Sequence, residues 1–389
     1  MLAQVLILGG RGRIGQSVAA DLLQHTHATV IVTGRVIPDP SSPHPPTPSS
    51  PHPPTPSSPH LPHPLALDLA DHKSLEQAIA ASQLVIHCAG PFRYRDTDVL
   101  ERCIRLGVNY LDVSDDRSFT QRALQHRQAA QAAGVTAIVN TGVFPGISNS
   151  MVRLGVEQLD RVEQIQLNYG VAGSGGAGLT VMRTTFLGLQ HPFAARIDGE
   201  WQMVHPYTGR ELVEFPAPYG RSAVYWFDMP ETYTLAEAFP ARTVITKFGS
   251  FPDLYNHLTW LTAHGFPAWL LQRPQTIEFL AKVSYRMTGI SDRFTGIGVA
   301  IQAEVSGEAQ GQPARHVSSF THVNTAVAAG QGTGNVAQFL LSGELRQPGV
   351  WSVEQALPND LFLRAMQSRG LEIEQTLIPQ PRTNLAHPS

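Results

Sequence analysis

The chain begins with a short apolar run that leads directly into a glycine-rich turn and a helix-forming segment. Residues 5–8 are Val-Leu-Ile-Leu, and Gly10, Gly12 and Gly15 follow with the spacing G-x-G-x-x-G. Four consecutive apolar residues suit a strand that is buried on both faces, as in a parallel sheet. Strand, glycine turn and helix in this order form the context in which the spacing indicates a dinucleotide-binding fold. These residues therefore predict a Rossmann-type domain.

The three glycines have separate physical roles in such a turn. Gly10 permits a tight turn, Gly12 lets a pyrophosphate approach the backbone, and Gly15 lets the helix pack close to the strand. The free N–H groups and the dipole at the start of the helix favour an anion. Without a ligand, the same glycines would form only a structural turn. A P-loop is excluded, because no Gly-Lys-Ser or Gly-Lys-Thr follows.

Strand-like apolar runs alternate with helix-forming segments as far as about residue 140. The expected strands after the first are 28–33, 65–69, 84–88, 110–113 and 135–140. Asp71 is a suitable N-cap for a helix that ends near Ala81, and Ser114 or Asp116 suits a later one. Regular alternation of strands and helices predicts a doubly wound parallel sheet, so the expected fold class is α/β.

The residue that follows the second strand indicates which dinucleotide binds. The sequence there is Gly34-Arg35. An acidic residue would hold the ribose 2′-OH of NAD, whereas an arginine can pair with the 2′-phosphate of NADP. Arg11 and Arg13 in the glycine turn either contact the same phosphate or are solvated surface charges. We therefore predict NADP rather than NAD.

A repetitive segment, 38–64, interrupts the domain at the place where a helix would normally follow the second strand. The octapeptide SSPHPPTP occupies 41–48 and again 49–56, and a degenerate third copy begins at Ser57. Proline removes backbone donors and favours extended geometry, and the segment has almost no apolar side chains for a core. We predict a disordered insertion over 38–64.

The pattern changes after residue 145. The expected strands are 162–171, 194–197, 211–215, 224–227, 243–248, 298–305 and 317–327, and the expected helices are 254–264, 267–286, 334–345 and 359–369. Hairpin-like spacing of the strands predicts a mostly antiparallel sheet. We expect a Rossmann domain over 1–145, an α+β substrate or dimerisation domain over 146–330, and C-terminal helices over 331–389 that return to the Rossmann domain.

Length, charge and cysteine content exclude several classes of protein. The chain has 389 residues, enough for two or more domains, and a net charge of −3, which gives no general electrostatic reason to bind nucleic acid. Its two cysteines, Cys88 and Cys103, form neither a metal-binding spacing nor a disulfide framework. No apolar stretch has the roughly 18 residues of a membrane span. We expect a cytoplasmic protein without a metal site.

Five motifs occur in a fixed order along the first part of the chain. They are the glycine turn, Thr33-Gly34-Arg35, Ala89-Gly90-Pro91-Phe92, the segment Gly-Val-Asn-Tyr-Leu-Asp at 107–112, and Gly-Val-Phe-Pro-Gly-Ile-Ser-Asn at 142–149. This series resembles the saccharopine dehydrogenase-like family, in particular the branch found in photosynthetic lineages. The segments 173–187 and 330–349 are similar to its second domain and C-terminal return. The resemblance spans most of the chain except 38–64 and implies an NADP-binding oxidoreductase.

Several other enzyme classes lack their required motifs in this chain. No tyrosine is followed four residues later by lysine, which excludes a short-chain dehydrogenase. Neither a G-x-S-x-G elbow nor an H-E-x-x-H helix is present, so hydrolase and zinc protease chemistry has no support.

Candidate site residues lie at the carboxyl ends of the expected parallel strands. The expected cofactor contacts are Gly10, Arg11, Gly12, Arg13, Ile14, Gly15, Arg35, Asp68, Ala89, Gly90, Pro91 and Phe92. Tyr110 or Asp112 is a candidate proton donor, as is a water molecule. The alternative is that Tyr110 packs in the core and Asp112 caps a turn. Asn149 and Arg183 are candidate substrate contacts.

These observations leave the reaction open between three functions. The first is hydride transfer at a C=N bond, as in amino-acid or polyamine metabolism; the second is an enoyl reductase for a lipid or isoprenoid; the third is a non-catalytic NADP-binding scaffold. A substrate with several carboxylates would need arginines such as Arg153, Arg183 and Arg221 in its cleft, whereas an apolar substrate would use the aromatic segments 219–233 and 248–269. Those segments otherwise fill the core or form a homodimer interface.

Overall fold

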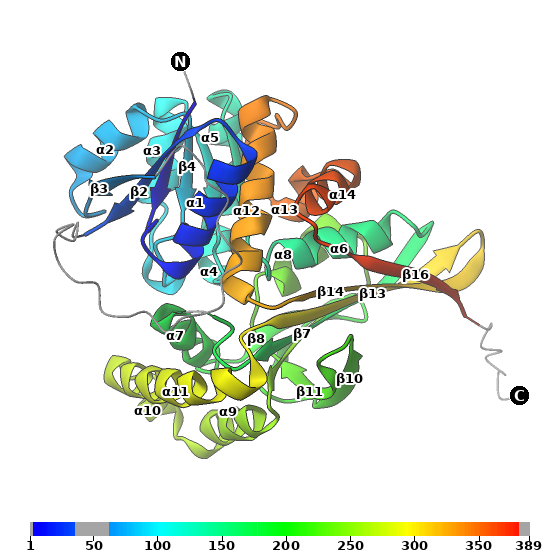
Figure 1. Ribbon diagram of the computed structural model, residues 1–389. Coiled ribbons are helices and arrows are strands. Elements are labelled where there is room, and N and C mark those ends of the chain that lie inside the picture. Colours follow the sequence, from blue (N-terminus) through cyan, green and yellow to red (C-terminus); the bar gives the residue numbers. More distant parts are fainter. Residues whose placement is uncertain (1–2, 36–61, 177, 381–389) are drawn as a thin grey trace, which may run out of the picture.

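The computed structural model describes residues 3–35, 62–176 and 178–380, which form two sheets and the helices around them (Figure 1). The first sheet has seven parallel strands in the order β15-β6-β5-β4-β1-β2-β3. Its strands are β1 (Gln4–Leu8), β2 (Thr29–Gly34), β3 (His63–Ala66), β4 (Leu84–His87), β5 (Asn109–Asp112), β6 (Thr136–Val139) and β15 (Gly349–Ser352). The predicted α/β class with a doubly wound parallel sheet is confirmed.

The first strand lies inside this sheet, between β2 and β4. Val5, Leu6, Ile7 and Leu8 are completely buried, since side chains alternate between two covered faces. One face packs against α1 (Arg13–His25) and α12 (Thr325–Ser342). The other packs against α2 (His72–Ala80), α3 (Asp98–Leu106), α4 (Arg117–Leu124) and α5 (Arg127–Ala132). The apolar run is therefore the centre of the nucleotide-binding half of the core.

Capping residues mark the ends of several of these helices. Asp71 caps α2, because its carboxylate accepts a hydrogen bond from the Ser74 backbone N–H at 3.1 Å. Asp116 caps α4 in the same way, accepting from Phe119 N–H at 2.9 Å. Gly107 ends α3 with a φ of 70°, which suits a residue without a side chain.

The second sheet also has seven strands, in the order β10-β11-β12-β7-β13-β14-β16. Its strands are β7 (Arg161–Ala172), β10 (Glu211–Phe215), β11 (Gly220–Trp226), β12 (Thr243–Phe251), β13 (Val299–Ala309), β14 (Gln312–His322) and β16 (Glu374–Pro379). Only β7 and β12 pair in parallel, so the sheet is mixed and mostly antiparallel, as predicted. A separate hairpin joins β8 (Phe193–Ile197) to β9 (Glu200–Val204).

Helices cover the second sheet and join it to the first. The remaining helices are η1 (Phe92–Tyr94), α6 (Ile147–Val156), α7 (Leu179–Leu187), α8 (Glu231–Ala238), α9 (Leu254–Gly265), α10 (Ala268–Leu271), α11 (Pro274–Thr295), α13 (Val353–Ala356) and α14 (Asn359–Ser368). Figure 1 shows α9, α10 and α11 grouped below α7, at the end of the molecule farthest from the first sheet. No helix in the described ranges is long and apolar enough to cross a bilayer.

Several element boundaries differ from the sequence-based expectation. β3 begins at His63, inside the predicted insertion 38–64, and Pro64 is tolerated there because β3 is an edge strand. The rest of the insertion, up to residue 61, lies outside the described residues. β14 ends at His322 rather than near 327, because Asn324 caps α12 by accepting from Ala326 and Val327 N–H. α12 consequently starts at Thr325 instead of 334.

The last part of the chain contributes to both sheets. β15 pairs with β6 in the first sheet, and β16, which the sequence analysis did not anticipate, pairs with β14 in the second. Between them, α14 is tied to α1 by a buried ion pair, with Arg369 donating to Asp21 at 2.6 and 2.9 Å. The domain limits at 145 and 330 remain predictions.

Candidate active site at the carboxyl edge of the parallel sheet

The glycine turn between β1 and α1 leaves one position open to a ligand. Cβ atoms added at Gly10 and Gly15 would lie 2.8 Å from Val32 and 2.6 Å from Gly10, respectively, so both positions are closed by the fold. A Cβ at Gly12 would meet only the Gly9 carbonyl, at 3.2 Å. The positive φ of the turn, 72°, belongs to Gly9, which the sequence analysis did not single out. The expected roles of Gly12 and Gly15 agree with this geometry.

The start of α1 has no polar side chain that would compete with a bound anion. Its N-cap is Gly12, and its first turn contains no acidic residue. The first N–H groups of any helix lack intrahelical acceptors and therefore attract negative charge. The open position at Gly12 and the uncapped helix start together fit the pyrophosphate of a dinucleotide.

The end of β2 carries cationic and hydroxyl groups. Arg35 is exposed there, and the side chain of Arg11 lies against Gly34, where an added Cβ would be 2.5 Å from its Cδ. The Thr33 hydroxyl accepts from Gly9 N–H at 3.2 Å, which ties β2 to the glycine turn. With no carboxylate at residues 33–35, this edge fits a 2′-phosphate rather than a free ribose hydroxyl.

Two other expected cofactor residues have contacts of a different kind. Arg13 donates to the Gly176 carbonyl at 2.9 Å and to the Tyr285 hydroxyl at 3.0 Å, so it connects the start of α1 with the second domain. Asp68 is exposed after β3 and accepts from Ala70 N–H at 3.0 Å in a local turn. Both residues border the glycine-turn side of the sheet, and their contact with a cofactor remains a prediction.

The segment after β4 forms the opposite wall of the cofactor crevice. A Cβ at Gly9 would lie 2.8 Å from Ala89 Cα, so this segment packs directly on the glycine turn. A Cβ at Gly90 would be 3.4 Å from Thr180 of α7, which therefore faces the crevice from the second domain. Phe92 is buried and packs on the rings of His87 and Phe119, at 5.1 and 4.9 Å. Phe92 thus holds the segment in place from within the core.

The two predicted proton donors lie inside the protein rather than at a cavity wall. Tyr110 is fully buried, and burial and the neighbouring Asp112 raise the pKa of its hydroxyl far above 10. Asp112 is also fully buried and accepts from the backbone N–H groups of Ser114 and Asn140, both at 3.0 Å. These bonds hold the loops after β5 and β6, which matches the structural alternative considered from the sequence. A catalytic role for either residue remains untested.

A cavity of about 370 Å³ runs from the carboxyl edge of the first sheet into the second domain. Arg93, Asp115 and Phe144, which follow β4, β5 and β6, line its inner end. Its other walls are mainly apolar side chains of α7, α9, α11 and β12, with Phe227 and Met229. The cavity therefore joins the expected nicotinamide position to an apolar chamber.

Charged side chains at the inner end are arranged in pairs. Arg93 Nε lies 3.1 Å from Asp116 Oδ2, and Arg117 Nε lies 2.8 Å from Asp228 Oδ1. Asp115 lines the cavity, and burial together with the neighbouring Asp116 raises its pKa to about 6. A carboxyl group with that pKa exchanges its proton near neutral pH, as a general acid requires.

Sequence reasoning missed Asp115, although a signal for it was present. It follows the predicted strand 110–113, at the sheet edge where ligands bind in doubly wound folds. The nearby Asp112 attracted attention because it belongs to a recognised motif. Only the path of the chain after β5 shows which of the two carboxyl groups reaches the cavity.

The arginines considered for a carboxylate-rich substrate do not gather at this cavity. Arg183 pairs with Glu278 at 2.6 Å, and Arg153 donates to Glu157 at 2.7 Å, while Arg221 is exposed on β11. The other predicted substrate contact, Asn149, is buried in a different place. Its amide donates to Glu354 at 2.9 Å, and its carbonyl accepts from Gly146 N–H. Of the two clefts distinguished in the sequence analysis, the structure has the apolar one.

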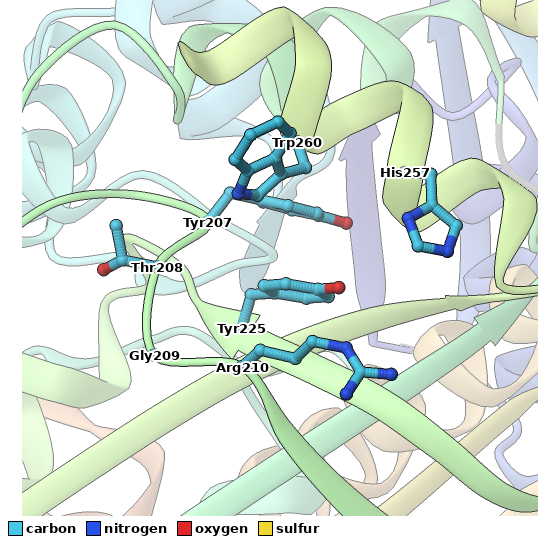
Figure 2. Close-up of a pocket in the computed structure, with 7 residues that line it drawn as sticks. All are labelled: Tyr207, Thr208, Gly209, Arg210, Tyr225, His257 and Trp260. Atoms are coloured by element: carbon cyan, nitrogen blue, oxygen red, sulfur yellow. The ribbon is translucent and has the colours of Figure 1, made fainter.

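A second recess lies wholly within the second domain (Figure 2). Tyr207 and Tyr225 stack with ring centroids 4.7 Å apart, Arg210 extends beside them, and His257 and Trp260 come from α9. None of its lining residues belongs to the first sheet or the loops at its carboxyl edge. Of these two cavities, the one at Asp115 is therefore the one that adjoins the carboxyl edge of the first sheet. Within the described residues, no cluster of three or more metal-binding side chains occurs.

Comparison with known proteins agrees with this arrangement. The sequence model of the family described as "Saccharopine dehydrogenase NADP binding domain" matches residues 53–138. Carboxynorspermidine synthase of Vibrio alginolyticus is 26% identical over 340 residues, which covers 79% of this chain and 81% of that protein. A human saccharopine dehydrogenase-like oxidoreductase is 29% identical over 76 residues, covering 19% of this chain and 18% of that protein.

The fold is also shared with a solved structure. Apo saccharopine dehydrogenase (L-Glu forming) from Saccharomyces cerevisiae superposes with a TM-score of 0.65 at 14% identity, covering 97% of this chain and all of that one. At this identity the likeness shows the two-sheet architecture only. It places the mixed second sheet, as well as the Rossmann sheet, within a known arrangement.

The parallel sheet, the open glycine turn and the basic end of β2 define an NADP-binding oxidoreductase. Residues 53–138 match the saccharopine dehydrogenase NADP-binding domain, and the chain is similar to saccharopine dehydrogenase-like proteins. The resemblance inferred from the ordered motifs and the prediction of NADP as cofactor are both confirmed.

Proposed function

We propose that this chain is an NADPH-dependent reductase that acts on a double bond in an elongated, mainly apolar substrate. The supporting observation is the cavity that starts beside Asp115, at the cofactor edge, and continues between apolar side chains of α7, α9 and α11. A substrate in this cavity has its reacting atoms at the polar end and its apolar part in the chamber. Enoyl reduction fits this arrangement best.

The bound cofactor supplies a hydride, and the protein must supply the accompanying proton. The Asp115 carboxyl group lies at the inner end of the cavity and has a pKa near 6. It donates the proton to the carbon next to the one that receives the hydride, so that one hydride and one proton add across the C=C bond. Arg93, held by Asp116 at 3.1 Å, is positioned at the same end to bind a carbonyl oxygen.

Reduction of an imine is the second candidate function. It is favoured by the relative named carboxynorspermidine synthase, whose similarity extends over 79% of this chain. The same carboxyl group would then protonate the imine nitrogen. The lining of the cavity distinguishes the two functions, because a polyamine or a carboxylated imine gains little from apolar walls.

A substrate series measured with NADPH tests the proposal. We expect kcat/KM for 2-alkenals to rise by roughly fourfold for each added methylene until the chamber is filled, since each buried CH₂ contributes about 0.8 kcal/mol. Imines formed in solution from an aldehyde and a primary amine, with or without a carboxylate, form the comparison series. Preference for the short polar imines would favour the second candidate. Tight NADPH binding without turnover of any member would favour a non-catalytic scaffold.

A further inference from the structure

Exposed apolar side chains are concentrated on α9, α10 and α11. Ten of the eighteen large apolar side chains that are exposed in the described residues lie between 254 and 294. Figure 1 shows these helices side by side at the end of the second domain. Contiguous apolar surfaces of this kind usually mark a binding surface for a partner or a membrane.

The longest of these helices, α11, presents a continuous apolar stripe to solvent. This outer stripe consists of five side chains between 38% and 86% exposed: Phe279, Val283, Met287, Ile290 and Phe294. Their spacing of four, four, three and four residues confines them to about 80° of the helix circumference. The residues that α11 buries, Ile277, Ala281 and Thr288, face another direction. The outer stripe is therefore additional to the face that holds α11 on the domain.

A row of basic side chains borders the outer stripe. Lys282, Arg286 and Arg293 are exposed, and their positions on the helix place them together along one side of the stripe. Among the described residues, Arg286 and Arg293 form no ion pair. Of the two acidic residues of α11, Asp292 accepts hydrogen bonds from Ser174, and Glu278 pairs with Arg183 of α7 and with Lys282. An apolar stripe with a basic flank is the pattern of a helix that lies on an anionic bilayer surface.

The substrate cavity opens beside the outer stripe. Val283 and Met287 belong to the stripe and also line the cavity. Leu258 and Leu261 of α9 line it from the other side and are 38% and 55% exposed. The gap between α9 and α11 thus has apolar side chains on both sides, and we call it the mouth of the cavity.

We propose that α9 and α11 dock on a bilayer with anionic headgroups, and that the mouth between them receives the apolar substrate directly from that bilayer. The docking rests on the outer stripe and the basic row; only the identity of the transferred molecule rests on the proposed reductase function. A second copy of the chain on the same surface would cover the mouth. The adjacency of mouth, stripe and basic row therefore favours a lipid surface.

Flotation of the full chain with vesicles tests the docking step without any enzymatic reaction. We expect binding to vesicles of phosphatidylcholine with phosphatidylglycerol, weaker binding to phosphatidylcholine alone, and loss of binding at high salt. Ile290→Ser/Phe294→Ser should weaken the partition coefficient by roughly tenfold or more. Met203→Ser/Leu212→Ser, which changes two exposed apolar side chains on β9 and β10, is the matched control and should bind as the wild type does.

A second pair of variants tests how much the basic row contributes to vesicle binding. Arg286→Glu/Arg293→Glu should lose roughly tenfold or more in binding to the anionic vesicles, at about tenfold for each 1.4 kcal/mol. Arg221→Glu/Arg346→Glu makes the same change in net charge at exposed positions outside α9, α10 and α11 and should bind normally. Equal loss in both charge variants, or no vesicle binding by the wild type, would overturn the docking proposal. A dimer of the wild type that dissociates in Ile290→Ser/Phe294→Ser would assign the surface to a second copy.

Delivery from the bilayer is tested separately by turnover. A long-chain 2-alkenal embedded in anionic vesicles should be reduced at least tenfold more slowly by Ile290→Ser/Phe294→Ser than by the wild type, whereas a short water-soluble 2-alkenal should be reduced equally by both. Equal rates with the embedded substrate would contradict delivery through the mouth. Failure of all substrates while vesicle binding persists would refute the reductase function and leave the docking intact.

Discussion

Arg35 is the residue that we expect to decide the choice between NADP and NAD. It lies exposed at the end of β2, beside a glycine turn whose Gly12 position is open. Its position at the end of β2 is enough to predict a contact with the cofactor, because a β-α-β unit brings the end of its second strand to the adenosine ribose. The identity of the side chain then decides between a hydroxyl and a phosphate.

Arg35→Asp should reverse the cofactor preference. We expect the Kd for NADPH to rise by roughly ten- to a hundredfold, which corresponds to a charge-assisted hydrogen bond of about 1.5–3 kcal/mol, and the Kd for NADH to stay unchanged or fall. Fluorescence titration with both cofactors measures this. Arg346→Asp, at an exposed position before β15, is the control. Equal weakening for NADPH and NADH would show that Arg35 does not contact the 2′-phosphate.

Asp115 should control the pH dependence of turnover. Its pKa of about 6 means that the acid form is lost as pH rises above that value, so kcat/KM for reduction should fall on the alkaline side. Asp115→Asn should lower kcat by about 10²–10⁴ and remove this pH dependence, while Asp115→Glu retains part of both. Asp360→Asn on α14 is the control. An unchanged pH profile in Asp115→Asn would assign the proton to another donor.

At the scale of elements, the residues that cap helices could be predicted from the sequence, whereas the distance at which two helices pack could not. Asp71 and Asp116 marked helix starts correctly from local chemistry alone. The early start of α12 was missed because Asn324 follows a strand that continues the apolar pattern up to residue 323. Gly330 and Gly334 allow α12 to cross α1 closely. An added Cβ at Gly330 would be 2.5 Å from backbone and side-chain atoms of Ser17.

Gly330→Ala should therefore destabilise the fold, although alanine is the better helix former. We expect the free energy of unfolding to fall by roughly 1–3 kcal/mol, because α12 must move away from α1. Gly289→Ala in α11 is the matched control, since a Cβ there would meet nothing within 4 Å. It should be neutral or stabilising by up to about 1 kcal/mol. Urea unfolding measures both, and equal effects would show that the close approach does not matter.

At the scale of the whole molecule, a buried polar network joins the two sheets. The Glu231 carboxylate of α8 accepts from Tyr169 of β7 at 2.7 Å and from Ser148 of α6 at 3.3 Å. Glu354 of α13 lies in the same network through Asn149. Burial, with a contribution from Glu354, raises the pKa of Glu231 from 4.5 to about 7. The folded state therefore holds this proton more tightly than the unfolded state does.

The stability of the chain should respond to this network between pH 4.5 and 7. Because the pKa of Glu231 is raised in the folded state, its protonation contributes fully to the free energy of unfolding below pH 4.5. This contribution is lost as pH rises to about 7, and the loss is at most roughly 3 kcal/mol. Glu231→Gln should remove this loss. The urea concentration at its unfolding midpoint should therefore rise relative to that of the wild type as pH increases. Glu237→Gln, exposed on the same helix, should follow the wild type. A parallel pH dependence in wild type and Glu231→Gln would exclude Glu231 as the titrating group.

The sequence alone determined the parallel sheet, the glycine turn and the cofactor. These features depend on residues close together in the chain, where apolar runs, glycine spacing and the residue after a strand act locally. The tertiary structure decided what lies at the carboxyl edge of the sheet. Asp115 rather than Asp112 reaches the cavity, and Arg183 is neutralised by Glu278 of α11, ninety-five residues away. The packing of elements that are distant in the sequence decides which side chains line the same cavity. Local sequence patterns do not predict this packing.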